Sequence, residues 1–165
     1  GLNYIEFSPD GTVSIEKINL PNEVSQQLES SLMLFYLGKT RSAPVILEKQ
    51  NISNHIGTIS KMVNLARVMR DELKNGSLDN FGDILHEGWE YKKELSASIS
   101  GKERDEAYTA ACLSGATGGK LLGAVQTGFM LLFVPPESQR KVREALGTLF
   151  ELKFKFDNTG TINIY

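Results

Sequence analysis

The chain opens with two apolar segments separated by turn-forming residues. Residues 2–7 and 12–20 are rich in strand-forming side chains that alternate imperfectly with polar ones, and a Pro-Asp-Gly turn lies between them at 9–11. This combination predicts a β-hairpin. The pattern then predicts a short helix over 21–28 and, from the unbroken apolar run at 32–37, a strand that is buried on both faces.

Helical spacing dominates the middle of the chain. Apolar residues recur at every third or fourth position over 54–73, and the Asn-Gly pair that follows is a typical helix end. Two further helices are predicted over about 78–95 and 103–113. In the first of them, Trp89 and Lys92 lie roughly on one stripe of the helix.

The last third of the chain combines strands with one helix. The glycine-rich residues 115–120 predict a loop, and apolar residues at 121–122 and 129–134 predict two short strands joined by a tight turn. A helix is expected over 137–146, and clean alternation over 150–156 predicts a half-buried strand. This order of elements predicts an α+β domain in which helices pack on one face of an antiparallel sheet.

Composition and charge narrow the classes of function. The 165 residues suit one domain, and 41% hydrophobic with 23% charged residues is typical of a globular protein. A net charge of −2 and the absence of a long apolar run give no reason to expect nucleic acid or a membrane as partner. Cys112 is the single cysteine, so we expect a packing residue and a reducing, cytoplasmic compartment. Two histidines without paired ligand spacing do not indicate a zinc site.

Glycines are concentrated in one stretch, which suggests a phosphate-binding loop. Five of them occur within residues 115–128, and such a loop can turn backbone N–H groups toward an anion. Neither known fingerprint fits, because the Walker spacing fails on both sides of Gly119–Lys120 and no Gly-x-Gly-x-x-Gly can be found. From the residues alone, a glycine-rich turn without a ligand is the simpler interpretation.

The motifs of this stretch change that interpretation. The run GATGGKLLGA, followed shortly by GFMLLF, resembles the third conserved motif of the GHMP kinase superfamily, and residues 2–18, 34–43 and 85–100 resemble its heptose-phosphate kinase branch. The resemblance implies a ferredoxin-like sheet with additional helices, in which residues 1–165 form the C-terminal domain. Residues 1–20 would then be a hairpin at the junction with an N-terminal ATP-binding domain.

The resemblance also implies where ligands bind. It assigns a nucleotide or phosphate loop to Gly118, Gly119, Lys120, Gly123, Ala124 and Gly128. Arg41 follows a predicted strand and carries a guanidinium that suits a sugar phosphate, so it is a candidate for substrate binding. Two further candidates lie in the matching helix, where the alternatives are a histidine satisfied by neighbours and a solvated lysine: His86 and Lys93.

Two hypotheses follow for the function. The first is the C-terminal domain of an ATP-dependent sugar or sugar-phosphate kinase, inactive by itself because ATP and Mg²⁺ are held mainly by the N-terminal half. The second is a noncatalytic module that binds a small metabolite or a partner, because Val125, Gln126 and Thr127 replace glycines of the family motif. Without its N-terminal domain the chain would expose an apolar surface, so we expect it to form a dimer or higher oligomer.

Overall fold

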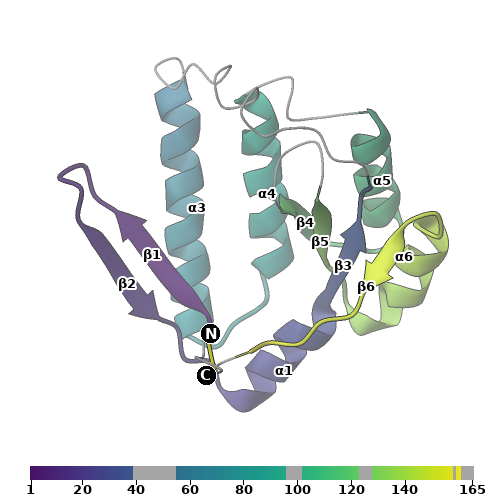
Figure 1. Ribbon diagram of the computed structural model, residues 1–165, viewed down its shortest axis with the longest axis horizontal. Coiled ribbons are helices and arrows are strands. Elements are labelled where there is room, and N and C mark those ends of the chain that lie inside the picture. Colours follow the sequence, from purple (N-terminus) through teal and green to yellow (C-terminus); the bar gives the residue numbers. More distant parts are fainter. Residues whose placement is uncertain (39–54, 96–101, 123–127, 158, 161–165) are drawn as a thin grey trace, which may run out of the picture.

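A computed structural model describes residues 1–38, 55–95, 102–122, 128–157 and 159–160. Its strands and helices follow the expected order along the chain (Figure 1). They are β1 (Asn3–Phe7), β2 (Val13–Lys17), α1 (Asn22–Ser31), β3 (Leu32–Tyr36), α3 (Ile56–Lys74), α4 (Phe81–Glu94), α5 (Lys102–Leu113), β4 (Gly118–Leu122), β5 (Phe129–Phe133), the 3₁₀ turn η2 (Pro136–Ser138), α6 (Gln139–Ala145) and β6 (Phe150–Leu152).

Four of the described strands form one antiparallel sheet in the order β4-β5-β3-β6. In chain order these elements are a strand, helices α3 to α5, the β4–β5 pair, helix α6 and a last strand. This is the β-α-β-β-α-β arrangement of a ferredoxin-like sheet. The predicted α+β class is therefore confirmed, and the additional helices lie in the first crossover.

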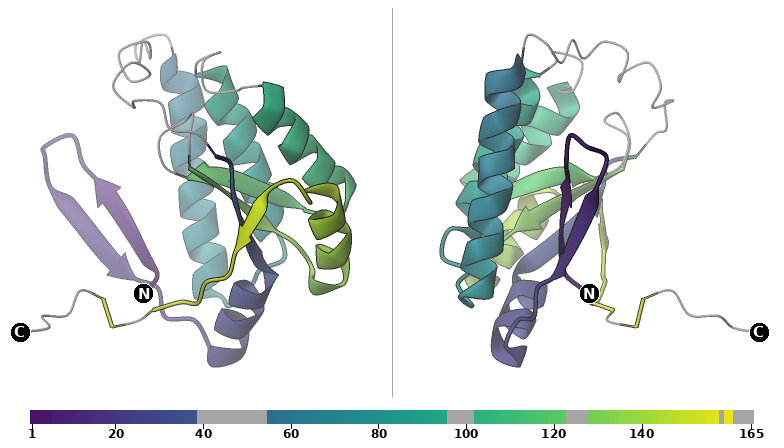
Figure 2. Two further views of the ribbon diagram at one scale, coloured as in Figure 1. Left: turned by 45° about the vertical axis from the view of Figure 1, so that its right-hand side comes forward. Right: turned by 90° about the vertical axis from the view of Figure 1, so that its left-hand side faces the viewer.

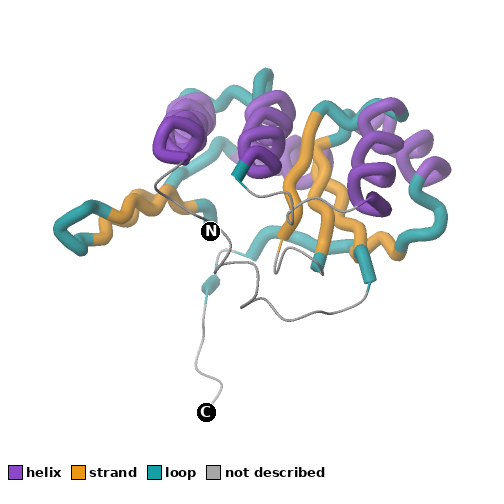
Figure 3. The backbone as a smooth tube through the Cα atoms, turned by 90° about the horizontal axis from the view of Figure 1, so that it is seen from above, coloured by secondary structure: helices purple, strands orange, loops and turns teal. Residues whose placement is uncertain are grey.

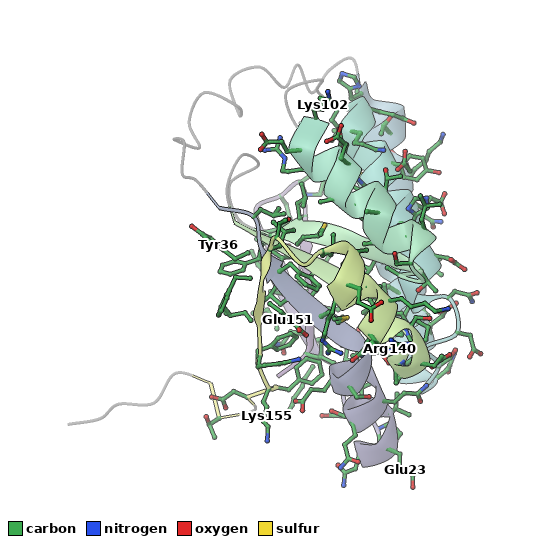
Figure 4. All side chains as sticks on the ribbon, turned by 90° about the vertical axis from the view of Figure 1, so that its right-hand side faces the viewer. Glu23, Tyr36, Lys102, Arg140, Glu151 and Lys155 are labelled. Atoms are coloured by element: carbon green, nitrogen blue, oxygen red, sulfur yellow. The ribbon has the colours of Figure 1, made fainter. Side chains whose placement is uncertain are left out.

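Helices α3, α4, α5 and α6 all lie on one face of this sheet (Figure 3). Met33, Phe35, Met130 and Leu132 point toward the helices and are at most 2% exposed. Tyr36, in contrast, is 41% exposed and lies on the side of the sheet away from α5 and α6 (Figure 4). The prediction that β3 is buried on both faces was therefore wrong, because helices cover only one of them.

Helix α4 lies directly on β4, and glycines permit the close approach. A Cβ atom on Gly118 would lie 1.8 Å from the carbonyl oxygen of Gly82, and one on Gly82 would lie 1.8 Å from Thr117 Oγ1. Only residues without side chains fit at these two positions. The loop predicted over 115–120 was wrong for its second half, because Gly118, Gly119 and Lys120 belong to β4 and pair with β5.

The first two strands form a separate antiparallel hairpin that projects beside α3 (Figure 2). Its polar side faces the helix, where Arg67 pairs with Glu6 at 2.8 Å and Lys74 with Glu16 at 2.5 Å. The guanidinium of Arg70 lies 4.8 Å from the ring centre of a hairpin tyrosine. The opposite side bears four exposed apolar residues, which we call the outer face of the hairpin: Ile5, Phe7, Val13 and Ile15.

Two boundaries differ from the sequence prediction. Strand β6 pairs with β3 over only three residues and ends at Leu152, whereas alternation predicted a strand over 150–156. Beyond it, the backbone amide of Phe156 donates a hydrogen bond to a carboxylate oxygen of Glu29 in α1, at 2.6 Å. The chain is thus held by α1 instead of by a neighbouring strand. Helix α1 also continues to Ser31, past its predicted end at residue 28.

Candidate functional site

Several elements end together at one end of the sheet. In the strand register, Phe129 lies opposite both Tyr36 and Leu122, so the end of β3, the end of β4 and the start of β5 are neighbours. The last turn of α4 lies at the same end, in the upper part of Figure 1. We call this region the loop end of the sheet. Loops that follow strands on a rigid scaffold commonly carry binding residues.

Gly128 helps to close this end of the sheet. Its φ of +144° is one that residues with side chains rarely adopt. Its carbonyl oxygen accepts a hydrogen bond of 3.0 Å from the amide of Leu37, which links the start of β5 to the segment after β3. The structure therefore gives Gly128 a conformational role, and its contact with a phosphate stays a prediction.

Lys120 lies two residues before the end of β4 and is exposed. Lys92 of α4 is its neighbour, half-buried, and the pKa of its ammonium is lowered by burial and by the positive charge of Lys120. Within the described residues neither lysine has an acidic partner. The sequence predicted Lys120 as a ligand residue but not Lys92. The position of Lys92 on the same helix stripe as Trp89 could have indicated that this lysine is partly buried.

His86 lies farther down α4, where its backbone amide is next to Gly118 at the start of β4. Its Nδ1 atom is 2.8 Å from the hydroxyl oxygen of Tyr108, and the two rings are nearly parallel with centres 5.9 Å apart. Burial raises the pKa of the Tyr108 phenol, which keeps this hydroxyl protonated. The imidazole is exposed, and in the described part of the chain Nε2 has no hydrogen-bond partner. A bond from Nε2 to a sugar hydroxyl is geometrically open and stays a prediction.

Lys93 has contacts within its own helix. Its ammonium nitrogen lies 2.6 Å from a carboxylate oxygen of Glu90 and 5.9 Å from the ring centre of Trp89. Its charge is therefore partly neutralised, and the structure does not join it to the Lys92–Lys120 pair. The predicted contact between Lys93 and substrate remains untested.

The other predicted ligand residues fall into two groups. Gly118 and Gly119 are buried in β4 beneath α4 and α5, where they serve packing. The remaining three candidates and the altered motif lie outside the described residues: Arg41, Gly123, Ala124 and 125–127. Among the described candidates, Lys120 and Gly128 lie at the loop end of the sheet, as does Lys93 in the last turn of α4.

Two further residues serve packing, and for Cys112 this role was predicted. Trp89 is 5% exposed and belongs to the core beneath the helices. Cys112 is half-buried, and burial raises the pKa of its thiol, which disfavours the reactive thiolate. Among the described residues, no group of three or more His, Cys, Asp or Glu side chains is placed to hold a metal ion. The described helices include none that is long and apolar enough to cross a bilayer.

Known proteins resemble both this sequence and this fold. No family model matches the chain. Over 150 residues it is 28% identical to D-glycero-alpha-D-manno-heptose 7-phosphate kinase of Campylobacter jejuni, a match that covers 88% of this chain and 44% of that protein. This chain is a homologue of a heptose-phosphate kinase. The resemblance predicted from its motifs is thereby confirmed.

Solved structures give the same result. A D-glycero-D-manno-heptose 1-phosphate kinase from Bacteroides thetaiotaomicron superposes with a TM-score of 0.64 at 28% identity, covering 94% of this chain and 42% of that one. Mevalonate kinase of L. major, at 12% identity, shares the fold with a TM-score of 0.66, over 87% of this chain and 46% of its own. The chain therefore spans less than half the length of these relatives.

Proposed function

We propose that this chain acts as the C-terminal domain of an ATP-dependent sugar or sugar-phosphate kinase. In this role it helps to bind a heptose-phosphate-like substrate and to close over the nucleotide phosphates. The observation that carries the proposal is the match to the heptose 7-phosphate kinase, which runs along 88% of this chain but only 44% of the relative. A second half would supply most of the contacts to ATP and Mg²⁺, and the chain alone would not turn over ATP.

The loop end of the sheet supports a contribution to phosphoryl transfer. Catalysis of this reaction consists almost entirely of positioning and of stabilising charge on the phosphates. Lys92 and Lys120 supply positive charge there, and Gly128 sets the turn into β5. His86, with a free Nε2 among the described contacts, suits a sugar hydroxyl.

The outer face of the hairpin is the proposed contact with the other half of the kinase. Phe7 is 76% exposed, Ile15 68%, Val13 52% and Ile5 48%, on a ribbon of two strands whose outer edges pair with no other strand that the structure describes. A contiguous apolar patch beside unpaired strand edges favours association with another sheet. When the chain is produced alone, the same face would pair two copies, so we expect a dimer or higher oligomer.

The first test is the segment encoded before residue 1. A kinase must carry a phosphate loop and an acidic residue in that segment, and a polypeptide that includes it should phosphorylate a sugar phosphate in an ATP-coupled assay. The 165-residue chain should be inactive in the same assay. Activity of the short chain alone, or an upstream segment without a phosphate loop, would overturn the proposal.

Calorimetry separates a kinase from a noncatalytic module. MgATP and MgADP are titrated into the extended polypeptide, once with the natural residues and once with Val125, Gln126 and Thr127 replaced by glycine. Binding by the natural protein, with little change in the variant, supports the kinase. Binding by the glycine variant alone would mean that the loop has lost nucleotide affinity, and the noncatalytic module would take its place.

A further inference from the structure

A polar contact between His86 and Tyr108 joins helix α4 to helix α5. The Nδ1 atom of His86 lies 2.8 Å from the hydroxyl oxygen of Tyr108, and the planes of the two rings differ by only 5°. The two residues belong to different helices and are 22 positions apart in the chain. The contact therefore arises from the tertiary fold, and it engages one of the two nitrogens of the imidazole.

Tyr108 is the fixed member of this pair. It is 6% exposed and belongs to the core that also contains Trp89, whose ring centre lies 6.1 Å from its own. A Cβ atom on Gly119 would lie 3.3 Å from Cε2 of the tyrosine, so the ring also lies close to β4. A packed aromatic ring thus holds the hydroxyl in place, whereas the imidazole of His86 is exposed.

The direction of the hydrogen bond follows from the chemistry of the two groups. Burial raises the pKa of the Tyr108 phenol, so the hydroxyl keeps its proton at neutral pH. A bare imidazole nitrogen is a strong acceptor for this proton, whereas the thiol of Cys112, one turn farther along α5, is a weak one. Tyr108 therefore donates to Nδ1, and the single proton of the neutral imidazole lies on Nε2.

The second ring nitrogen, Nε2, faces no partner of its own. In the part of the chain that the structure describes, it has no hydrogen bond. Glu90 lies one turn farther along α4, but its carboxylate pairs with Lys93 at 2.6 Å. An N–H group on an exposed ring, held by a buried neighbour, is positioned to donate to an oxygen atom of a bound molecule.

We propose that Tyr108 is a positioning residue that holds His86 as the Nε2–H tautomer, so that His86 donates a hydrogen bond to an oxygen atom of the sugar phosphate substrate. The assignment of the ligand rests on the proposed kinase function, whereas the tautomer rests on the contact with Tyr108. A nitrogen that already carries its proton cannot take one from the reacting hydroxyl. In this state His86 binds and orients the substrate and is not the general base.

The tautomer is measured by ¹⁵N NMR on the 165-residue chain at about pH 8.5, where an ordinary histidine is neutral. Protonated and bare ring nitrogens give well-separated shifts, and His86→Gln assigns the signals because it leaves only those of His55. We expect a protonated Nε2 and a bare Nδ1 in His86. Tyr108→Phe should lower the ratio of the Nε2–H to the Nδ1–H tautomer about fivefold, because it removes the donor to Nδ1.

Two comparisons keep this measurement specific. Tyr91→Phe is the matched control, since it removes the hydroxyl of an α4 tyrosine that donates to Glu87, and it should leave the ratio unchanged. Phenylalanine preserves the ring volume at both positions, so the core beside Trp89 stays filled. A protonated Nδ1 in the natural chain, which requires no variant to fold, would overturn the proposal. So would an equal ratio in the Tyr108→Phe and Tyr91→Phe variants.

The ligand is tested by kinetics on the extended polypeptide. His86→Phe should raise the KM for the sugar phosphate about tenfold and leave the KM for ATP unchanged. His86→Gln places an amide N–H near the position of Nε2 and should bring the KM for the sugar phosphate to within about threefold of the natural value. A rise in the KM for ATP alone, or no rise in either KM, would overturn the assignment to the sugar phosphate.

The two proposals fail in different ways. If Tyr108 fixes the Nε2–H tautomer but the extended polypeptide transfers no phosphoryl group, the positioning contact stands and the kinase function does not. If the extended polypeptide is an active kinase and Tyr108→Phe leaves the tautomer ratio unchanged, the kinase function stands and the positioning role of Tyr108 is overturned.

Discussion

Apolar and polar side chains alternate in two antiparallel strand pairs, β3–β5 and β1–β2, but opposite sides of the two pairs face the helices. In β3 and β5 the apolar side chains Met33, Phe35, Met130 and Leu132 face the helices and form the core. The hairpin of β1 and β2 lies beside α3 (Figure 2), and there it is the polar side that faces the helix, while the outer face of the hairpin is exposed. Alternation therefore identifies a strand and its two faces, but it does not decide which face a neighbour covers.

The two regions are also stabilised by different forces. The four-stranded sheet is held by buried apolar area beneath α4, α5 and α6. The hairpin contacts α3 through exposed ion pairs such as Arg67–Glu6, in which the side chains are 50% and 37% exposed, and Tyr4 adds a smaller apolar contact in the cluster that includes Leu73. Exposed pairs contribute little to stability and are screened by salt. The sheet should therefore determine the stability of the chain, and the hairpin its association.

Phenylalanine occurs in both regions, and its replacement by alanine should give the largest difference in the free energy of unfolding. Phe35→Ala should lower the free energy of unfolding by about 3–5 kcal/mol, because it empties a site that is 1% exposed. Phe7→Ala, at a site that is 76% exposed, should change it by about 0.5 kcal/mol or less. Urea denaturation followed by Trp89 fluorescence at low protein concentration measures both. Similar losses for the two variants would contradict the comparison.

The α4–β4 contact gives the next largest effect. Gly118→Ala should cost about 1–3 kcal/mol or unfold the domain, because the new methyl group would lie 1.8 Å from a backbone oxygen that cannot move without shifting α4. Gly57→Ala is the matched control in α3, since nothing lies within 4 Å of its added Cβ. That change should stabilise the chain by about 0.5 kcal/mol. A harmless Gly118→Ala would show that the two elements do not touch.

A smaller effect concerns the ion pair that joins α6 to β6. Arg143 donates to both carboxylate oxygens of Glu151, at 2.8 and 3.1 Å, and this holds the pKa of Glu151 below its usual value. Because the folded-state pKa is lowered, the stabilisation is complete above the unfolded-state value and is lost as pH falls through the folded one. Glu151→Gln should therefore cost about 1–2 kcal/mol at neutral pH and reduce the loss of stability below about pH 4.

The control for this prediction lies on α6. Glu144 pairs with Arg140 at 3.0 Å, but the two side chains are 62% and 81% exposed. Glu144→Gln should cost only a few tenths of a kcal/mol, about the value of an exposed helical pair. Thermal unfolding between pH 3 and pH 7 compares the variants. Equal losses for both would mean that the partial burial of Glu151 adds nothing.

The smallest effect on stability is expected from the outer face of the hairpin, where the readout is association. Serine at Ile5, Phe7, Val13 and Ile15 should leave the unfolding transition nearly unchanged. It should convert the isolated chain from an oligomer to a monomer in light scattering at micromolar concentration. A natural chain that is already monomeric there, or a variant that still associates, would contradict the role of this face.

Much of the fold could be predicted from local patterns. The hairpin, the spacing of α3 and α4 and the apolar side of α6 follow from short-range periodicity, and the ferredoxin-like sheet followed from the motif resemblance. The start of β4 could not be predicted in this way, because Gly118 and Gly119 have low strand propensity. Their missing side chains are instead explained by distant contacts, since Gly118 lies against α4 and Gly119 against β5 and Tyr108 of α5. The end of β6 depends likewise on Glu29, far away in the sequence.

The candidate site shows the same division. Glycine content and the resemblance pointed to Lys120 and Gly128, which the structure places at the loop end of the sheet. Lys92 was missed as a candidate, because helical spacing alone cannot say that the charge of Lys120, far away in the sequence, acts on it. Contacts of His86 with Tyr108 and of Lys93 with Glu90 were equally invisible in the sequence.

The sequence by itself determined where strands and helices form, that the domain is α+β and that it resembles a heptose-phosphate kinase. These properties depend on residues near one another in the chain or on short motifs that can be recognised in the sequence itself. The tertiary structure alone decided which face of each strand is covered, where β4 begins and that His86 meets Tyr108. Such properties arise from contacts between distant segments, whose geometry is set by packing and by the few glycines that allow two backbones to touch.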